Sequence, residues 1–121
     1  MVPINPVLLR YLSAIPLILM IAAIFIGGEA PGAGTLFPPP WDKIVHFVTF
    51  GGIAVLAGLA LPTRPLWLIL LLVVSLGAAD EIHQMFIQGR QPGLDDLFAD
   101  FLGGLCALPV VYLLRKWLYR L

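Results

Sequence analysis

The stretch "LWLILLLVVSLGAADEIHQMF", residues 66–86, decides the fold class. Its first fourteen residues are all apolar or small, and they lead directly to Asp80 and Glu81. At about 1.5 Å per residue, a helix of this length matches a hydrocarbon core about 30 Å thick. Carboxylates inside that core do not persist facing lipid. The stretch therefore predicts a membrane-spanning helix whose carboxylates face other polar groups or water.

The composition of the whole chain agrees with a membrane protein. Hydrophobic residues make up 60% of the 121 residues and charged residues 12%, whereas soluble domains have roughly 45–50% and about 25%. A chain this short cannot bury so much apolar surface in a water-soluble core. A formal net charge of zero, with no basic stripe, argues against a nucleic-acid partner. Cys106, the single cysteine, offers neither a disulfide nor a thiolate metal site.

Apolar runs of spanning length occur four times, which predicts an all-α, polytopic membrane protein: a bundle of four transmembrane helices in a single domain, 1–121. The expected spans are about 7–26, 44–61, 66–86 and 97–114. The first is expected to be a retained helix rather than a cleaved signal peptide, because no clear A-x-A site follows it. Gly and Pro mark the segment between the first two spans as a loop.

The placement of lysine and arginine predicts the orientation of the bundle. Two cations fall on the side of the two longer loops: Lys43 and Arg90. Five fall on the opposite side: Arg10, Arg64, Arg115, Lys116 and Arg120. Cytoplasmic loops carry the excess of Lys and Arg, so both termini are expected in the cytoplasm and both longer loops outside it.

Polar residues converge on the outer ends of the last three expected helices. Five of the seven acidic residues lie within residues 80–100. Because isolated charges are expensive in hydrocarbon, we expect these groups to face one another or a water-filled cavity, and to pair with Lys43, Arg90 and His46. Spacing of three or four residues places members of the set on shared helix faces. The candidate ligand-binding residues are Lys43, His46, Asp80, Glu81, Gln84, Arg90, Asp96 and Asp100.

Two stretches, "DKIVHFVTFGG" (residues 42–52) and "DEIHQMFIQGRQPGLDDLFADFLGG" (residues 80–104), resemble the VanZ-like family of small bacterial membrane proteins. The family pattern is Asp-Lys-x-x-His-Phe at a helix start, followed later by Glu-x-x-Gln, Arg, Asp, Asn and Gly. The matching positions here are Asp42, Lys43, His46, Phe47, Glu81, Gln84, Arg90, Asp96 and Gly103. Asp100 stands where the family usually has Asn. A carboxylate only accepts hydrogen bonds unless it is protonated, so a proton or a cation must offset Asp100.

The resemblance implies a bacterial cytoplasmic (inner) membrane protein of the cell envelope, with membrane lipids as partners and a link to teicoplanin-type glycopeptide resistance. We expect the extracytoplasmic polar site to bind an amphiphilic ligand: a lipoglycopeptide, an envelope lipid or a lipid-linked cell-wall precursor. Lys43 or Arg90 would hold an anionic head group. No cofactor is expected.

Two other interpretations stay open. The site could belong to an intramembrane enzyme that modifies or hydrolyses a lipid-linked substrate by acid–base catalysis, with His46, Glu81, Asp96 and Asp100 as its catalytic groups; whether the chain is an enzyme is undecided. A variant of this enzyme would use His46, Asp80, Glu81 and Asp96 to hold a divalent metal ion that activates water, although no ligand-spacing motif supports it. Alternatively, the polar residues could form a purely structural network that joins three helices. An ion pathway is disfavoured because the inner halves of the spans are almost free of polar residues.

Overall fold

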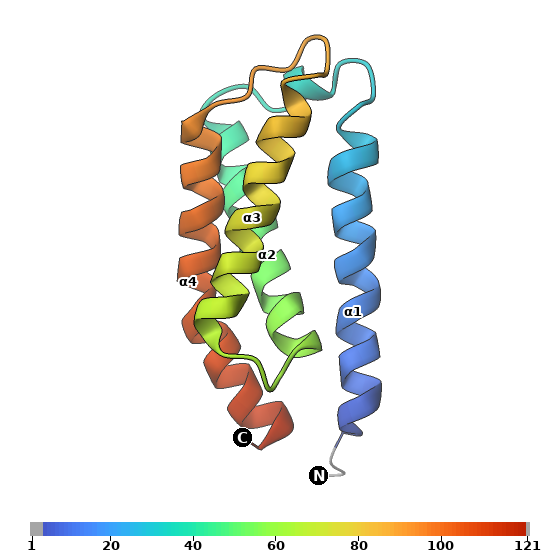
Figure 1. Cartoon of the computed structure of the whole chain (residues 1–121), viewed down its shortest axis with the longest axis vertical. Helices are drawn as coiled ribbons and strands as arrows, with labels where there is room; N and C mark the ends of the chain where they lie inside the picture. The colour runs from blue at the N-terminus through green and yellow to red at the C-terminus, as the bar shows by residue number, and fades with distance from the viewer. Residues whose placement is uncertain (1–3, 121) are drawn as a thin grey trace.

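The computed structural model describes residues 4–120 and shows an all-helical bundle (Figure 1). Within this range four helices are long and apolar enough to cross a membrane, which confirms the predicted fold class. The elements are α1 (Pro6–Ala22), a π-helical turn η1 (Ala23–Gly27), a short 3₁₀ turn η2 (Ala33–Thr35), α2 (Trp41–Ala60), α3 (Leu66–Gln84) and α4 (Leu94–Tyr119).

The start of α2 and both ends of α4 extend beyond the predicted spans, whereas α3 ends at Gln84, two residues before its predicted end. α2 begins at Trp41, three residues early, and α4 extends from Leu94 to Tyr119 rather than over 97–114. The apolar run used to predict a span ends at the first charged residue, whereas the helix itself continues through that residue. Asp42, Asp95 and Asp96 therefore lie within first turns, where carboxylates complement the helix dipole.

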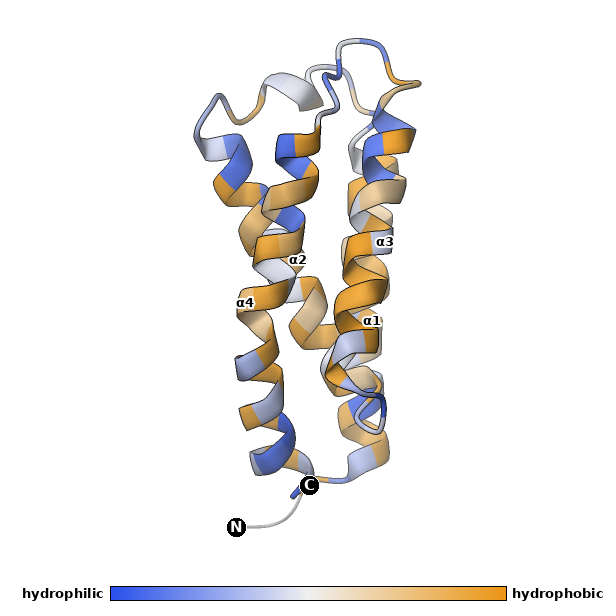
Figure 2. Cartoon of the chain, turned by 60° about the vertical axis from the view of Figure 1, so that its left-hand side comes forward, coloured by the Kyte–Doolittle hydropathy of each residue, from blue (hydrophilic) through white to orange (hydrophobic). Residues whose placement is uncertain are grey.

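The bundle has one polar end and one end where α1 begins and α4 ends. The α1–α2 and α3–α4 loops lie together at the polar end, and the short α2–α3 turn lies at the other (Figure 1). Coloured by hydropathy, the helices are mostly apolar along their middles, with hydrophilic residues gathered toward the ends (Figure 2). The core is apolar and centres on Phe50, Ile53, Ala54, Ile69 and Val73. α1 is peripheral, since only Leu9 and Ser13 are buried in it.

Glycines allow α2 and α4 to pack closely. A Cβ atom on Gly103 would overlap the backbone carbonyl of Phe47, and a Cβ on Gly51 would lie 3.2 Å from the carbonyl oxygen of Gly103. Small residues at such positions let helix backbones approach one another in membranes. This contact holds the start of α2 beside the start of α4 and so determines where their polar residues meet.

Side chains from α1 and α4 donate hydrogen bonds to backbone carbonyls at the end of α2. The carbonyl of Gly58 would normally accept from the N–H of residue 62, but that residue is a proline and has no N–H. The Nε of Arg115 donates to it instead at 2.9 Å. Nη1 and Nη2 of Arg115 donate to the carbonyls of Arg64 and Leu61, at 2.7 and 2.8 Å respectively. Two further bonds join the set: Tyr119 to the carbonyl of Leu59, and Arg10 to that of Ala60.

Candidate functional site

Ten residues from α2, α3, α4 and the α3–α4 loop gather at the polar end of the bundle, and we call them the polar cluster. Every candidate residue named from the sequence lies in it or lines the cavity beside it. Asp42 and Asp95 join them through Lys43. The polar cluster consists of Asp42, Lys43, His46, Asp80, Glu81, Gln84, Arg90, Asp95, Asp96 and Asp100.

Lys43 joins the start of α2 to the start of α4. Its Nζ lies 2.6 Å from Asp42 Oδ2, 2.6 Å from Asp96 Oδ1 and 3.1 Å from Asp95 Oδ2. An ammonium group has three protons, so one is available for each carboxylate. Lys43 therefore lies in the expected place, but in this arrangement it is an inter-helix tie with no donor left for an anionic ligand.

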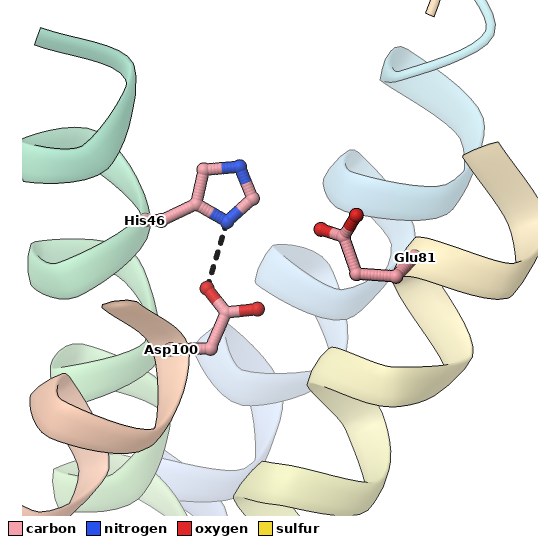
Figure 3. A group of neighbouring side chains, drawn as sticks. All are labelled: His46, Glu81 and Asp100. Carbon is pink, nitrogen blue, oxygen red and sulfur yellow. Dashed lines mark hydrogen bonds and ion pairs between the residues drawn. The ribbon is translucent and has the colours of Figure 1, made fainter. Parts of the chain in front are cut away.

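His46, Asp100 and Glu81 converge from three different helices (Figure 3). His46 Nδ1 lies 2.7 Å from Asp100 Oδ1, and His46 Nε2 lies 4.0 Å from Asp96 Oδ2. Asp100 is fully buried and Glu81 is 8% exposed. In Figure 3 the Glu81 carboxylate points from α3 toward the imidazole and Asp100. One atom from each of these three residues lies within 4.8 Å of the other two.

The remaining buried polar residues of α3 are held by hydrogen bonds. Gln84 Nε2 donates to Asp80 Oδ2 at 3.0 Å, as their spacing of four residues on one helix predicts. The backbone N–H of Gly93 donates to Glu81 Oε2 at 2.9 Å and ties the α3–α4 loop to α3. These contacts orient the α3 carboxylates inward, away from the lipid-facing surface.

A cavity of about 800 Å³ lies between the two loops and the polar cluster. Residues from the α1–α2 loop line one side, and Lys43, His46, Asp80, Arg90 and Asp96 are among the polar residues that line it. We expected Arg90 to pair with a carboxylate, and for residues 4–120 that expectation is wrong: its guanidinium makes no ion pair or side-chain hydrogen bond with them. The α3–α4 loop holds it at the cavity wall instead.

An apolar groove adjoins the cavity on the α2–α4 side. It has a volume of about 460 Å³, and Ile44, Phe47, Phe98, Ala99 and Leu102 supply its apolar lining. Lys43 and Asp95 line both the groove and the cavity. A polar space and an apolar space therefore meet at one edge of the polar cluster.

One ion pair at this end was not predicted from the sequence. His83 Nε2 lies 2.9 Å from Glu29 Oε1, and the His83 ring packs against Phe25 with a centroid distance of 5.3 Å. Glu29 lies in a Gly- and Pro-containing loop with no helical periodicity, so no spacing rule connects it to His83. The pair links the end of α3 to the segment after α1.

Negative charge exceeds positive charge in the polar cluster. It has six carboxylates, while Lys43 and Arg90 are its permanent cations. Asp80, Glu81, Asp96 and Asp100 are all buried. Among the described residues, Glu81 Oε1 and Asp100 Oδ2 are buried without a hydrogen-bond partner. Buried acceptors without partners are costly, so the polar cluster is suited to receive hydrogen-bond donors or a cation.

Comparison with known proteins places the chain in a family. A family model described as VanZ/LLP1 matches residues 5–115, nearly the whole chain. No curated protein matches the sequence. No solved structure matches it either.

Proposed function

The chain belongs to the VanZ/LLP1 family of membrane proteins, and from this premise we propose that its polar end binds the head group of an amphiphilic cell-envelope ligand. The observation that carries the proposal is Arg90, a permanent cation on the wall of a cavity of about 800 Å³, with no pairing among residues 4–120. A guanidinium offers bidentate contacts to phosphate or carboxylate. An anionic head group is therefore the occupant that best satisfies it.

The neighbouring carboxylates favour a head group that also carries donors. Asp80 and Asp96 line the same cavity as Arg90. Each is tied at only one oxygen by a close hydrogen bond, Asp80 to Gln84 and Asp96 to Lys43. Hydroxyl, amide or ammonium groups of a ligand could donate to the other oxygens. An anion with nearby donors describes the head group of an envelope lipid, a lipid-linked cell-wall precursor or a lipoglycopeptide.

The apolar groove supports the amphiphilic character of the ligand. It opens between α2 and α4 and shares Lys43 and Asp95 with the cavity. A ligand with its head group at Arg90 could extend an acyl or prenyl chain along this groove toward the hydrocarbon. We propose that such binding underlies an effect on susceptibility to teicoplanin-type glycopeptides.

Native mass spectrometry of the purified protein with its retained lipids tests this function. The comparison is between wild type, Arg90→Ala and a matched control, Arg64→Ala, which removes the same charge from the exposed turn at the other end. We expect retained anionic amphiphile on wild type and on Arg64→Ala, and its loss from Arg90→Ala. Equal retention by all three proteins would show that the bound lipid does not use the cavity.

We also propose that the polar end faces the outside of the cytoplasmic membrane, on the basis of the Lys and Arg distribution. In a Cys106→Ala background, single cysteines at the exposed positions Thr35 and Thr63 mark the two ends of the bundle. A membrane-impermeant maleimide added to intact cells or spheroplasts should label Thr35→Cys and spare Thr63→Cys. The reverse pattern would place the polar end in the cytoplasm.

One observation keeps an enzymatic alternative in consideration. His46 Nδ1 and the buried Asp100 Oδ1 are 2.7 Å apart, an arrangement in which a carboxylate orients an imidazole for proton transfer. Glu81 and Asp96 are the further acid–base candidates. Turnover of a lipid-linked envelope substrate by the purified protein, lost in His46→Ala, would favour the enzyme. Binding with no product formed would favour recognition alone.

A further inference from the structure

We propose that His46, Glu81 and Asp100 bind a divalent transition-metal ion such as Zn²⁺. The three residues come from α2, α3 and α4 and offer one imidazole nitrogen and two carboxylate oxygens (Figure 3). These atoms lie within 4.8 Å of one another. Ligand atoms that share an ion at about 2.0–2.2 Å lie only a few ångströms apart, so small side-chain rotations would complete the geometry. This inference goes beyond the proposed function, because it does not require Arg90 or an amphiphilic ligand.

Two buried oxygen atoms without partners point to a missing group. Glu81 Oε1 and Asp100 Oδ2 have no hydrogen-bond partner among the described residues. Their residues are 8% and 0% exposed, so bulk water does not satisfy them. The other oxygen of each carboxylate is already held, by Gly93 N–H and by His46 respectively. Each carboxylate therefore has one oxygen without a partner that is left to coordinate.

Charge compensation favours a cation over a neutral donor at this point. Glu81 and Asp100 face one imidazole, and the buried carboxylates of Asp80 and Asp96 belong to the same cluster. Lys43 is occupied by its three carboxylates, and Arg90 forms no ion pair within residues 4–120. Buried carboxylates need a positive partner more strongly than exposed ones do. A divalent ion would supply two positive charges at the place where the described residues supply at most one.

The donor set indicates which class of ion fits. Imidazole with carboxylate oxygens suits Zn²⁺ and related transition metals. Ca²⁺ takes six to eight oxygen ligands, and Mg²⁺ is bound mainly through oxygen atoms and water. Three protein ligands on a four-coordinate ion leave one position open. Because His46 also lines the cavity, this position could be reached by a molecule bound there.

Metal loading of the purified protein tests the proposal. The protein in detergent is stripped with a chelator and reloaded with Zn²⁺, and bound metal is then measured by elemental mass spectrometry and titration calorimetry. We expect one Zn²⁺ per chain. Since loss of even an outer-shell partner typically weakens metal binding by about 10- to 100-fold, Glu81→Gln and Asp100→Asn should each weaken it at least that much.

His83→Ala is the matched control. His83 also lies beside a carboxylate, Glu29, at 2.9 Å, but it belongs to a different and exposed pair. This variant should bind Zn²⁺ as wild type does. Loss of zinc in His83→Ala with retention in Glu81→Gln would overturn the assignment.

X-ray absorption by the zinc-loaded wild type gives a result that does not depend on how variants fold. The proposal predicts one imidazole and at least two oxygen ligands at about 2.0–2.2 Å. A sulfur ligand would assign the zinc to the exposed Cys106 and refute the site. Failure of the wild type to retain any Zn²⁺ after loading would refute it as well.

Discussion

Replacing Arg115 with methionine should destabilise the bundle strongly, because this one side chain donates hydrogen bonds to three backbone carbonyls at and after the end of α2. Methionine keeps an apolar stem of similar reach but removes the guanidinium. The change deletes three hydrogen bonds, to the carbonyls of Gly58, Arg64 and Leu61. The polar cluster lies at the opposite end of the bundle and should keep its contacts.

The size of the effect follows from the surroundings of each carbonyl. Gly58 is buried and has no backbone donor, so loss of its charged partner should cost about 1.5–3 kcal/mol. The Leu61 and Arg64 carbonyls lie in the partly exposed turn, where water can replace Arg115. Loss of each of these two hydrogen bonds should therefore lower the unfolding free energy by about 0.5–1 kcal/mol. The expected total is about 2.5–5 kcal/mol of unfolding free energy.

Reversible unfolding in mixed detergent micelles, followed by circular dichroism, measures this loss. The control is Lys116→Met, which removes a neighbouring cation whose Nζ lies 5.1 Å from the Tyr112 ring centroid. An exposed contact of that kind contributes about 0.5–1 kcal/mol. If Arg115→Met destabilised the protein no more than Lys116→Met does, these hydrogen bonds to the end of α2 would have no energetic importance and the reasoning would be refuted.

Three further predictions test the packing and the polar end. Gly103→Ala should lower the unfolding free energy by about 1–3 kcal/mol, because its methyl group would overlap the α2 backbone. The control is Gly52→Ala, whose Cβ would meet only the end of the Met20 side chain at 3.5 Å; this variant should unfold as wild type does. Lys43→Met should lower the unfolding free energy by about 2 kcal/mol, because it leaves the buried Asp96 without its cation. The loss is moderate because the Lys43 side chain is a third exposed, and an unchanged denaturation midpoint would contradict this prediction. Arg90→Ala should leave the melting temperature unchanged and remove the salt dependence of anionic amphiphile binding; a salt dependence equal to that of wild type would exclude Arg90 as the anion-binding group.

Local pattern was sufficient for the helices and for contacts within one helix. Long apolar runs predicted all four spans, and a spacing of four residues predicted the Asp80–Gln84 hydrogen bond. Both follow from the geometry of a single helix and the thickness of the bilayer. The gathering of polar residues at one end followed from chain direction alone.

Contacts between helices could not be predicted in the same way. The tie from Lys43 to Asp96 crosses 53 residues and depends on how closely Gly103 lets α2 and α4 approach. Arg115 was interpreted only as an orientation charge, because the need of Gly58 for a donor arises from Pro62 and appears only when α4 lies beside α2. Arg90 was expected to neutralise carboxylates, and its position on the cavity wall depends on the path of the α3–α4 loop.

We propose that the cavity at the polar end binds an anionic head group through Arg90. The dissociation constant of a short-chain anionic phospholipid, measured in one micelle system, tests this most directly. It should be measured for wild type, Arg90→Ala and Arg64→Ala. Loss of a charge-assisted contact predicts binding weakened by about 10- to 100-fold in Arg90→Ala, with Arg64→Ala binding as wild type does. Equal dissociation constants for all three folded proteins would contradict the account.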